Sequence, residues 1–166
     1  MARSGRIKKR ALEVDPIYGN RLIARITNRV MKDGKKSIAM AAVYGAIEIV
    51  VEKTQKETEF SQKDPAELVR LALENIKPVM EVRSRRIGGA AYQVPMPVKG
   101  DRREALSIRW LVESARKRPN KEFNTFAEKL AAELYDALRR EGLSVKKRND
   151  THKAAESNKA FAHFRW

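Results

Sequence analysis

The chain has 166 residues, about the length of one domain, and 42% of them are apolar, which is enough for one hydrophobic core. Lys and Arg number 36 against 21 Asp and Glu, so the net charge is +15. That excess is larger than solubility requires. It indicates a polyanionic partner, either a nucleic acid or a membrane surface.

The composition also excludes several classes of protein. Cysteine is absent, which excludes disulfides and thiolate metal sites and leads us to expect a cytoplasmic location. No run approaches the roughly 20 apolar residues of a membrane-spanning helix. The cations near residue 1 are not followed by the apolar stretch of a secretory signal. We therefore expect a nucleic acid, and no membrane, as the partner.

Residues 1–14 are predicted to form a basic, disordered arm, and residues 15–166 a single helical RNA-binding domain. The arm has no acid before Glu13. Its cations are Arg3, Arg6, Lys8, Lys9 and Arg10. Because the net charge of the arm is positive, like that of the whole chain, we favour contact with nucleic acid over a merely solvated tail.

Two helices are predicted before the first long loop. The first spans 20–31, with its apolar residues on one face and Gly34 as its stop. The second spans 37–53 and is apolar on most sides, so it should be the central, buried helix. Its main apolar stripe is expected to comprise Ile38, Ala41, Ala42 and Ile49. Gly45 lies on that stripe and should let a neighbouring helix approach closely.

A polar loop over 54–63 leads to a third predicted helix. Asp64 as cap, Pro65 at the first position and Glu67 three residues after the cap form a capping-box pattern, and Pro78 ends the helix. Acidic residues gather over 52–67. We therefore expect this end of the protein to point away from any phosphate.

The clearest β signal follows, at about 79–98. Two strands flank Gly88 and Gly89, a dipeptide typical of a two-residue hairpin turn. In that register Pro95 faces Val82 and Pro97 faces Met80, both at sites that donate no ladder hydrogen bond. The turn and the two prolines therefore support the same hairpin, whose tip should project unless something packs on it.

Three more helices are predicted after the hairpin. The fourth begins at Asp101 with a second capping box completed by Glu104, and Pro119 closes it. The fifth spans 123–140 with Gly142 as its stop, and the sixth runs from after Ser144 to about residue 159. The predicted fold class is mainly α, a six-helix bundle with a protruding two-stranded β-hairpin arm.

Three of the six predicted helix starts carry adjacent cations. These are Lys35 and Lys36; Arg102 and Arg103; and Lys146, Lys147 and Arg148. Cations are unfavourable at the positive end of a helix dipole, whereas a bound phosphate would reverse that effect. A basic composition could also scatter cations by chance, but we interpret these starts as phosphate sites.

The hairpin carries Arg83, Arg85 and Arg86 near its tip, with Tyr92 opposite Arg85. An arginine-rich ribbon with an aromatic residue can enter a groove or stack on an unpaired base. The alternative is a strand edge that charge protects from aggregation. We favour the contact with nucleic acid.

The search for catalytic residues gives no candidate. His152 and His163 are the two histidines, neither has the spacing of a metal pair, and His152 is expected to form a surface pair with Glu156. The segment 34–37 resembles the end of a phosphate-binding loop, but Arg29 occupies the position of its first glycine. We predict no enzyme activity, no metal and no cofactor.

Several motifs together closely resemble the bacterial small-subunit ribosomal protein seven family, in order and over nearly the whole chain. They are Asp33-Gly34-Lys35-Lys36-Ser37, the segment 81–89 with Tyr92-Gln93-Val94-Pro95, Ile108-Arg109-Trp110, Ala115-Arg116-Lys117-Arg118, Val145-Lys146-Lys147-Arg148, and the C-terminal segment 158–166. The family's fold is a helical bundle with a protruding hairpin. The segment 54–64 departs from the family by its greater length, and the N-terminal arm is similar only in its basic character.

The resemblance implies a primary binder of the 3′ major domain of small-subunit ribosomal RNA that nucleates assembly of the subunit head. It places the protein near the decoding region, beside small-subunit proteins nine and eleven. The implied RNA contacts are Lys35, Lys36, Arg102, Arg103, Arg109, Arg116, Lys146, Lys147 and Arg148, together with the arm. The hairpin residues Arg83, Arg85, Arg86, Gly88, Gly89 and Tyr92 would face exit-site transfer RNA and, as a further candidate, messenger RNA. A DNA-binding architectural protein is the alternative that charge alone allows.

Overall fold

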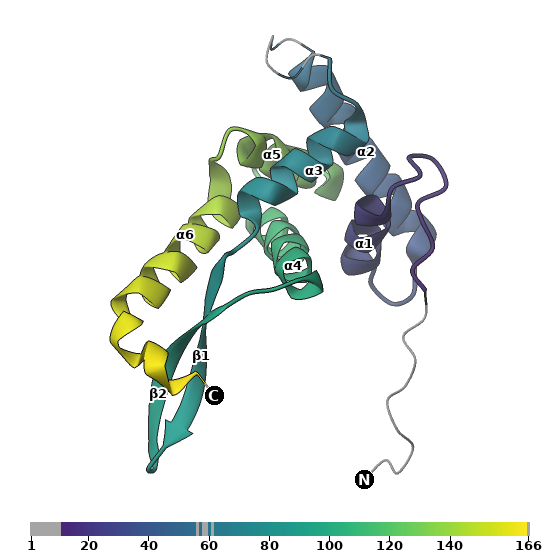
Figure 1. The fold of residues 1–166 in the computed structure, drawn as a ribbon. Coiled ribbons are helices and arrows are strands. Elements are labelled where there is room, and N and C mark those ends of the chain that lie inside the picture. Colours follow the sequence, from purple (N-terminus) through teal and green to yellow (C-terminus); the bar gives the residue numbers. More distant parts are fainter. Residues whose placement is uncertain (1–10, 56, 58–59, 61, 166) are drawn as a thin grey trace.

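The computed structural model describes residues 11–55, 57, 60 and 62–165, which form six α-helices, one β-hairpin and a final 3-10 helix (Figure 1). The helices are α1 (Arg21–Val30), α2 (Lys36–Thr54), α3 (Pro65–Ile76), α4 (Asp101–Lys117), α5 (Phe126–Leu138) and α6 (Gly142–Ser157). The hairpin pairs β1 (Met80–Ile87) with β2 (Ala90–Pro97), and η1 (Lys159–Phe164) follows α6. The mainly α fold with a hairpin arm is thus confirmed.

The arm cations Arg3, Arg6, Lys8, Lys9 and Arg10 lie outside the described residues. Within the described part of the chain, no helix has both the length and the apolar character that crossing a bilayer requires.

Helix α5 is the centre of the bundle and packs against α2, α3, α4 and α6. Its Leu130 and Ala131 are fully buried, as are Leu73 of α3 and Leu111 of α4. The expectation that α2 would be the central helix is therefore wrong.

Helix α2 lies at the edge of the bundle and buries one side only. Val43 and Ala46 face the core, whereas Ile38, expected on the buried stripe, is 65% exposed. Apolar residues surround this helix, so periodicity could not select the side that meets its neighbours. Helix α5 does pass beside Gly45, but a β-carbon there would lie 3.7 Å from the Cβ of Ala127, which is an ordinary van der Waals contact, so the approach does not require glycine.

Side-chain caps begin α1 and α3. Asn20 and Asp64 each accept the backbone N–H two residues ahead, at 2.7 and 3.2 Å. Glu67 does not complete the predicted capping box and instead pairs with Arg70 at 3.3 Å. Helix α1 ends at Val30, so Gly34 belongs to the turn before α2 and is not the helix stop.

The boundary between α5 and α6 differs from the prediction. A reciprocal capping box of Thr125 and Glu128 begins α5 three residues after the expected Phe123. The chain reverses at Arg140, whose φ is 61°, and Gly142, with φ 89°, begins α6 rather than ending α5. The Thr125–Glu128 capping box was a local signal that the prediction missed, whereas the start of α6 depends on Glu133 of α5, which no local pattern indicates.

The hairpin forms in the predicted register. Ile87 pairs with Ala90, and Pro95 and Pro97 face Val82 and Met80. Gly88 and Gly89 have φ of 56° and 89°, the left-handed conformation that such a turn requires. Figure 1 shows the hairpin extending from one end of the bundle, while the end of α2 and the start of α3 lie at the opposite end.

A buried ion pair joins the end of α4 to α5 and α6. Glu133 is 0% exposed and accepts hydrogen bonds from the Arg118 guanidinium at 2.8 and 2.9 Å, while its other oxygen accepts the N–H of Ser144 at 2.8 Å. Arg118 also bonds Asp136. Burial disfavours the charged guanidinium, but the hydrogen bonds to Asp136 and Glu133 outweigh it and raise the pKa of Arg118.

A histidine of α6 holds the base of the hairpin. The His152 Nε2 accepts the backbone N–H of Val79, the residue before β1, at 3.0 Å. Burial lowers the pKa of His152, and the nearby charges of Arg148 and Arg103 lower it further. The neutral ring that can accept this hydrogen bond is therefore favoured. His152 serves the hairpin and not the surface pair that the sequence suggested.

We predict that Glu133→Ala destabilises the protein by roughly 3–5 kcal/mol, because it removes one of the two carboxylates that pair with Arg118 and also the buried acceptor of the Ser144 N–H. Chemical denaturation measures this change. The control is Glu122→Ala, which removes an exposed carboxylate between α4 and α5. It should alter the unfolding free energy by less than about 0.5 kcal/mol. Equal stabilities for the two variants would contradict the structural role of the ion pair.

We also predict that the hairpin base weakens in mild acid. The pKa of His152 is lowered on folding. Its hydrogen bond to Val79 therefore contributes fully to the free energy of unfolding at pH values above the ordinary pKa of about 6.5. It is lost as pH falls from there toward the lower folded pKa, since protonation removes the acceptor. The loss should be on the order of 1 kcal/mol. In His152→Gln, which keeps an acceptor that does not titrate, this part of the pH dependence of unfolding should vanish. If the pH dependence of unfolding were the same in His152→Gln as in the wild type, this role of His152 would be refuted.

Candidate nucleic-acid interface

The start of α2 carries two cations beside the N–H groups of Ser37 and Ile38, which have no backbone partner among the described residues, whereas the N–H groups of Lys35 and Lys36 bond the Lys32 and Gly34 carbonyls. Lys35 is the N-cap residue and Lys36 the first helical residue, as predicted, and both are exposed. The first turn contains no acid, and no side chain caps it. Among the described residues neither lysine has an acidic partner within ion-pair distance. This helix start is therefore suited to a phosphate.

A basic groove runs between α1 and α4. Helix α1 supplies Arg21, Arg25 and Arg29, spaced by four residues, and α4 supplies Arg102 and Arg109. Two surface hollows of about 740 and 200 Å³ follow one another along this groove. The arginines of α1 were missed in the sequence, where only the apolar face of the helix was considered, although their spacing places them on one face.

Acidic residues on the rim of the groove form ion pairs with two of the α1 arginines. Arg25 pairs with Glu104 and lies 3.7 Å from Asp101, while Arg29 lies 3.6 Å from Glu113. Arg21 and Arg109 have no ion pair within the part of the chain that the structure describes. Together they are the groove cations most available to a phosphate.

Arg116, at the far end of α4, is also engaged within the protein. It donates a hydrogen bond to the Val30 carbonyl at 3.1 Å, which ties α4 to the end of α1. Since its side chain is exposed, it can still present charge to a partner.

The start of α4 is not the free phosphate site predicted. Gly100, with φ 54°, is the N-cap, so Asp101 does not cap the helix and Glu104 completes no capping box. Arg102 binds both carboxylate oxygens of Glu81 in β1, at 2.8–3.0 Å. Arg103 donates to the Pro78 carbonyl at 3.1 Å. Both arginines therefore attach α4 to the base of the hairpin.

Glu81 is the acid that organises this attachment. It is 8% exposed and also accepts a hydrogen bond from Arg83 at 2.5 Å. Burial alone would raise its pKa, but the hydrogen bonds from Arg102 and Arg83 outweigh burial and lower the pKa of Glu81. Arg83 is thus held at the base of the arm and does not lie at the tip.

The cations predicted at the start of α6 lie inside the helix, because α6 begins at Gly142. Lys147 pairs with Glu113 at 2.8 Å and lies over the ring of Trp110, while Arg148 donates to the Asn75 carbonyl. The hydrogen bond from Lys147 is the main reason that the pKa of Glu113 is lowered. Lys146 is the exposed member of the three.

The arm is braced by the C-terminal segment. Tyr92 packs against Phe161 and Phe164 of η1, with ring centroids 5.3 and 5.6 Å apart, and Arg165 donates to the Pro95 carbonyl at 2.7 Å. Tyr92 is therefore not free to stack on a base, contrary to the prediction. Of the two remaining hairpin arginines, Arg86 is exposed and Arg85 half-buried, near the exposed Gly88 and Gly89 of the tip.

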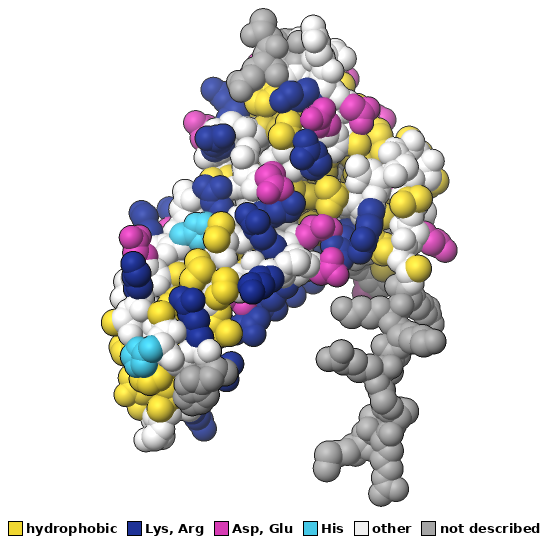
Figure 2. Space-filling view, in the orientation of Figure 1, with side chains coloured by type: hydrophobic (Ala, Val, Ile, Leu, Met, Phe, Trp, Pro, Cys, Tyr) yellow, Lys and Arg dark blue, Asp and Glu magenta, His cyan; other side chains and the backbone are white. Residues whose placement is uncertain are grey.

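The charged surface has a direction. Figure 2 shows Lys and Arg side chains spread across the middle of one face, over the region of α6, the hairpin and α4. The described acids between α2 and α3 lie at the end opposite the hairpin tip (Figure 1). No cluster of three or more potential metal ligands occurs among the described residues. Polyanion binding is the chemistry that this arrangement supports.

The chain is similar to known proteins over its full length. A family model described as ribosomal protein S7p/S5e matches residues 2–159. The small ribosomal subunit proteins uS7 of Caldicellulosiruptor saccharolyticus and Caldicellulosiruptor bescii are each 54% identical to it, and that of Moorella thermoacetica is 52% identical. Each match covers 166 residues and all of both chains.

Proposed function

Because the chain belongs to the ribosomal protein S7p/S5e family and is a structural constituent of the small ribosomal subunit, we propose that it is a primary binder of ribosomal RNA. Members of this family are cytoplasmic ribosome components and not enzymes. The proposed RNA target is the 3′ major domain, where binding would nucleate assembly of the subunit head.

The observation that carries this proposal is the free pair of lysines at the start of α2. Lys35 and Lys36 place two cations beside the N–H groups of Ser37 and Ile38, and no acid among the described residues lies within ion-pair distance of either lysine. The groove cations Arg21 and Arg109 extend the same charge along α1 and α4. Such an arrangement neutralises several phosphates of a folded RNA at fixed positions.

The hairpin tip supports a second contact, made after the protein has bound its RNA. The exposed Arg86 and the two turn glycines project beyond the part of the arm that η1 braces. We assign this tip to exit-site transfer RNA and, secondarily, messenger RNA. Small-subunit proteins nine and eleven are the proposed protein neighbours.

Reversing both lysine charges, Lys35→Glu with Lys36→Glu, should weaken binding to a transcript of the 3′ major domain by at least about tenfold. Acids at a helix N-terminus are neutral or mildly stabilising, so the free protein should unfold at the same or a slightly higher temperature. Filter binding and thermal unfolding measure the two effects. Competition with duplex DNA distinguishes the ribosomal function from that of an architectural DNA-binding protein. Duplex DNA would displace the transcript efficiently from an architectural DNA binder, but not from a protein specific for ribosomal RNA.

Its control is Lys53→Glu with Lys63→Glu, which reverses two charges at the opposite end of the bundle. These changes should leave RNA affinity within about twofold. If instead the Lys35 and Lys36 variant binds normally and unfolds early, the lysines serve the fold and the RNA site lies elsewhere.

Shortening the arm should separate assembly from the later contact. Replacing residues 86–91 by Asn-Gly closes a two-residue turn on the Arg85–Tyr92 pair, which keeps the register and the packing of Tyr92 on η1. We expect normal folding and assembly into the subunit, with exit-site transfer RNA lost faster from the ribosome. Arg86→Ala, which removes only the charge, should show a smaller loss. Failure to assemble would place the tip in the primary RNA site.

A further inference from the structure

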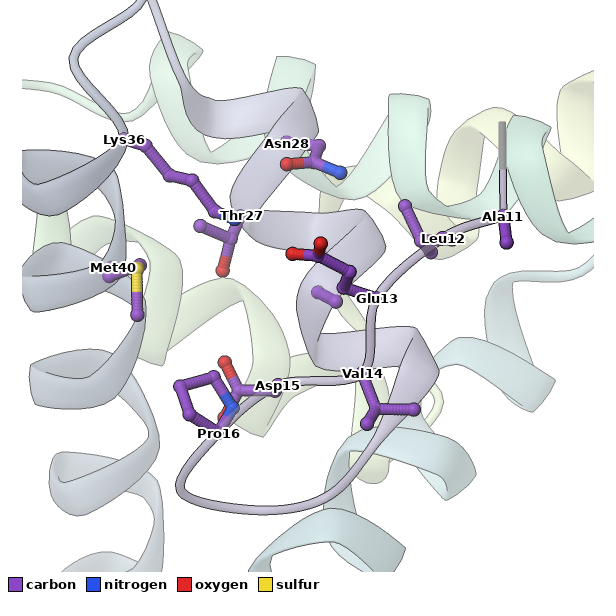
Figure 3. A pocket seen from close by; sticks show the side chains of 11 residues that line it. Ala11, Leu12, Glu13, Val14, Asp15, Pro16, Thr27, Asn28, Lys36 and Met40 are labelled. Carbon is purple, nitrogen blue, oxygen red and sulfur yellow. The ribbon is translucent and has the colours of Figure 1, made fainter. Parts of the chain in front are cut away.

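A pocket opens beside Lys36, between the segment 11–16, α1 and α2 (Figure 3). Its volume is about 180 Å³, room for about six water molecules at roughly 30 Å³ each. That space suits a single heterocyclic base. Met40 of α2 and Thr27 of α1 line the pocket, and the N-terminal segment forms its other wall.

The hydroxyl of Thr27 has no use within the free protein. Thr27 is 1% exposed, and its Oγ1 lacks a hydrogen-bond partner among the described residues. Figure 3 shows this oxygen turned toward the hollow, between Met40 and the segment that carries Asp15. A helical threonine ordinarily bonds a carbonyl one turn back. A buried hydroxyl left unpaired costs free energy, which a ligand in the pocket would recover.

Two carboxylates lie on the N-terminal wall, and they differ in availability. Asp15 is fully used, because it accepts the N–H groups of Ile17 and Tyr18 and the hydroxyl of Tyr44. Glu13 is exposed, and Figure 3 shows its carboxylate reaching toward the same hollow as the Thr27 hydroxyl. A carboxylate repels phosphate but accepts hydrogen bonds from the amino group of a base.

We propose that this pocket receives one unpaired, amino-bearing nucleobase of the bound RNA. Thr27 and Glu13 contact the edge of the base and Met40 its face, while the attached phosphate lies near Lys36 at the start of α2. Unpaired bases can be splayed out of a folded RNA in this way. This proposal rests on the function proposed above. It adds a base-specific contact to cations that position RNA without reading its sequence.

Removing only the hydroxyl tests the proposal, because Thr27→Val keeps the shape of the side chain. The free protein should be as stable as the wild type or more stable, since the hydroxyl has no partner there. The Kd for a 3′ major domain transcript should nevertheless rise roughly three- to tenfold. Chemical probing should show an amino-bearing base that the wild type protects and the variant leaves reactive.

Ser144→Ala is the matched control. It removes the other buried hydroxyl without a partner among the described residues, and it lies at the start of α6. Its effect on stability should resemble that of Thr27→Val, whereas RNA affinity and base protection should remain those of the wild type.

For a second variant, the proposal and a purely electrostatic role of Glu13 predict opposite changes in RNA affinity. If Glu13 were only a surface acid, Glu13→Met would tighten RNA binding by removing a negative charge. The proposal predicts instead that binding weakens by about tenfold, because methionine has a similar length but no oxygen to accept a hydrogen bond from the amino group of the base. Glu13 is exposed, so this variant does not depend on the fold tolerating a core change.

Two results would overturn the proposal. Wild-type affinity and footprint in Thr27→Val, with tighter binding in Glu13→Met, would show that the pocket holds only solvent, while leaving ribosomal RNA binding intact. Destabilisation of Thr27→Val with unchanged affinity would assign the hydroxyl to the fold. Absence of RNA binding by the wild type would instead refute the proposed function itself.

Discussion

The buried pair of Arg118 and Glu133 is the constraint from which the arrangement of the arm follows. Glu133 is fully enclosed, and its two oxygens join the end of α4 to the start of α6 through Arg118 and the Ser144 N–H. Gly142 passes so close that a β-carbon there would lie 3.1 Å from the Glu133 carboxylate. This carboxylate therefore fixes the start of α6, and the contacts of Lys147 with Glu113 and of Arg148 with the Asn75 carbonyl hold the helix further along.

The position of α6 in turn determines where the hairpin is held. Helix α6 brings His152 to the base of β1, and η1 then reaches Tyr92 further along the arm. On the other side, Glu81 attaches the base of the arm to α4 through Arg102. A two-stranded ribbon alone is marginal in water, so these contacts give the arm a fixed position before any RNA is bound.

The same acids divide the cations of this basic protein into two groups. Those facing Glu81, Glu104, Glu113 and Glu133 stabilise the fold. Those without an acidic partner, such as Lys35 and Lys36, remain available to phosphate. Net charge alone indicated a polyanionic partner, but only the three-dimensional pairing distinguishes Arg102, which attaches the hairpin, from Arg109, which faces solvent.

Local signals made much of the fold predictable. The two turn glycines and the placement of Pro95 and Pro97 specified the hairpin register, and apolar residues together with capping and helix-breaking residues located all six helices. The buried side of α2 was not predictable, because its apolar residues surround the helix. The partner of Tyr92 and the role of Gly142 depend on segments far apart in the chain. In the candidate interface, only the start of α2 among the three predicted helix starts proved to be free.

The salt dependence of RNA affinity tests the central claim, that unpaired cations at fixed positions hold ribosomal RNA, most directly. If α2 and the groove together neutralise four or more phosphates, the logarithm of the association constant should fall linearly with the logarithm of salt concentration. Affinity should then drop by at least about a hundredfold between about 50 and about 200 mM salt. An affinity that stays nearly constant over that range would contradict the account.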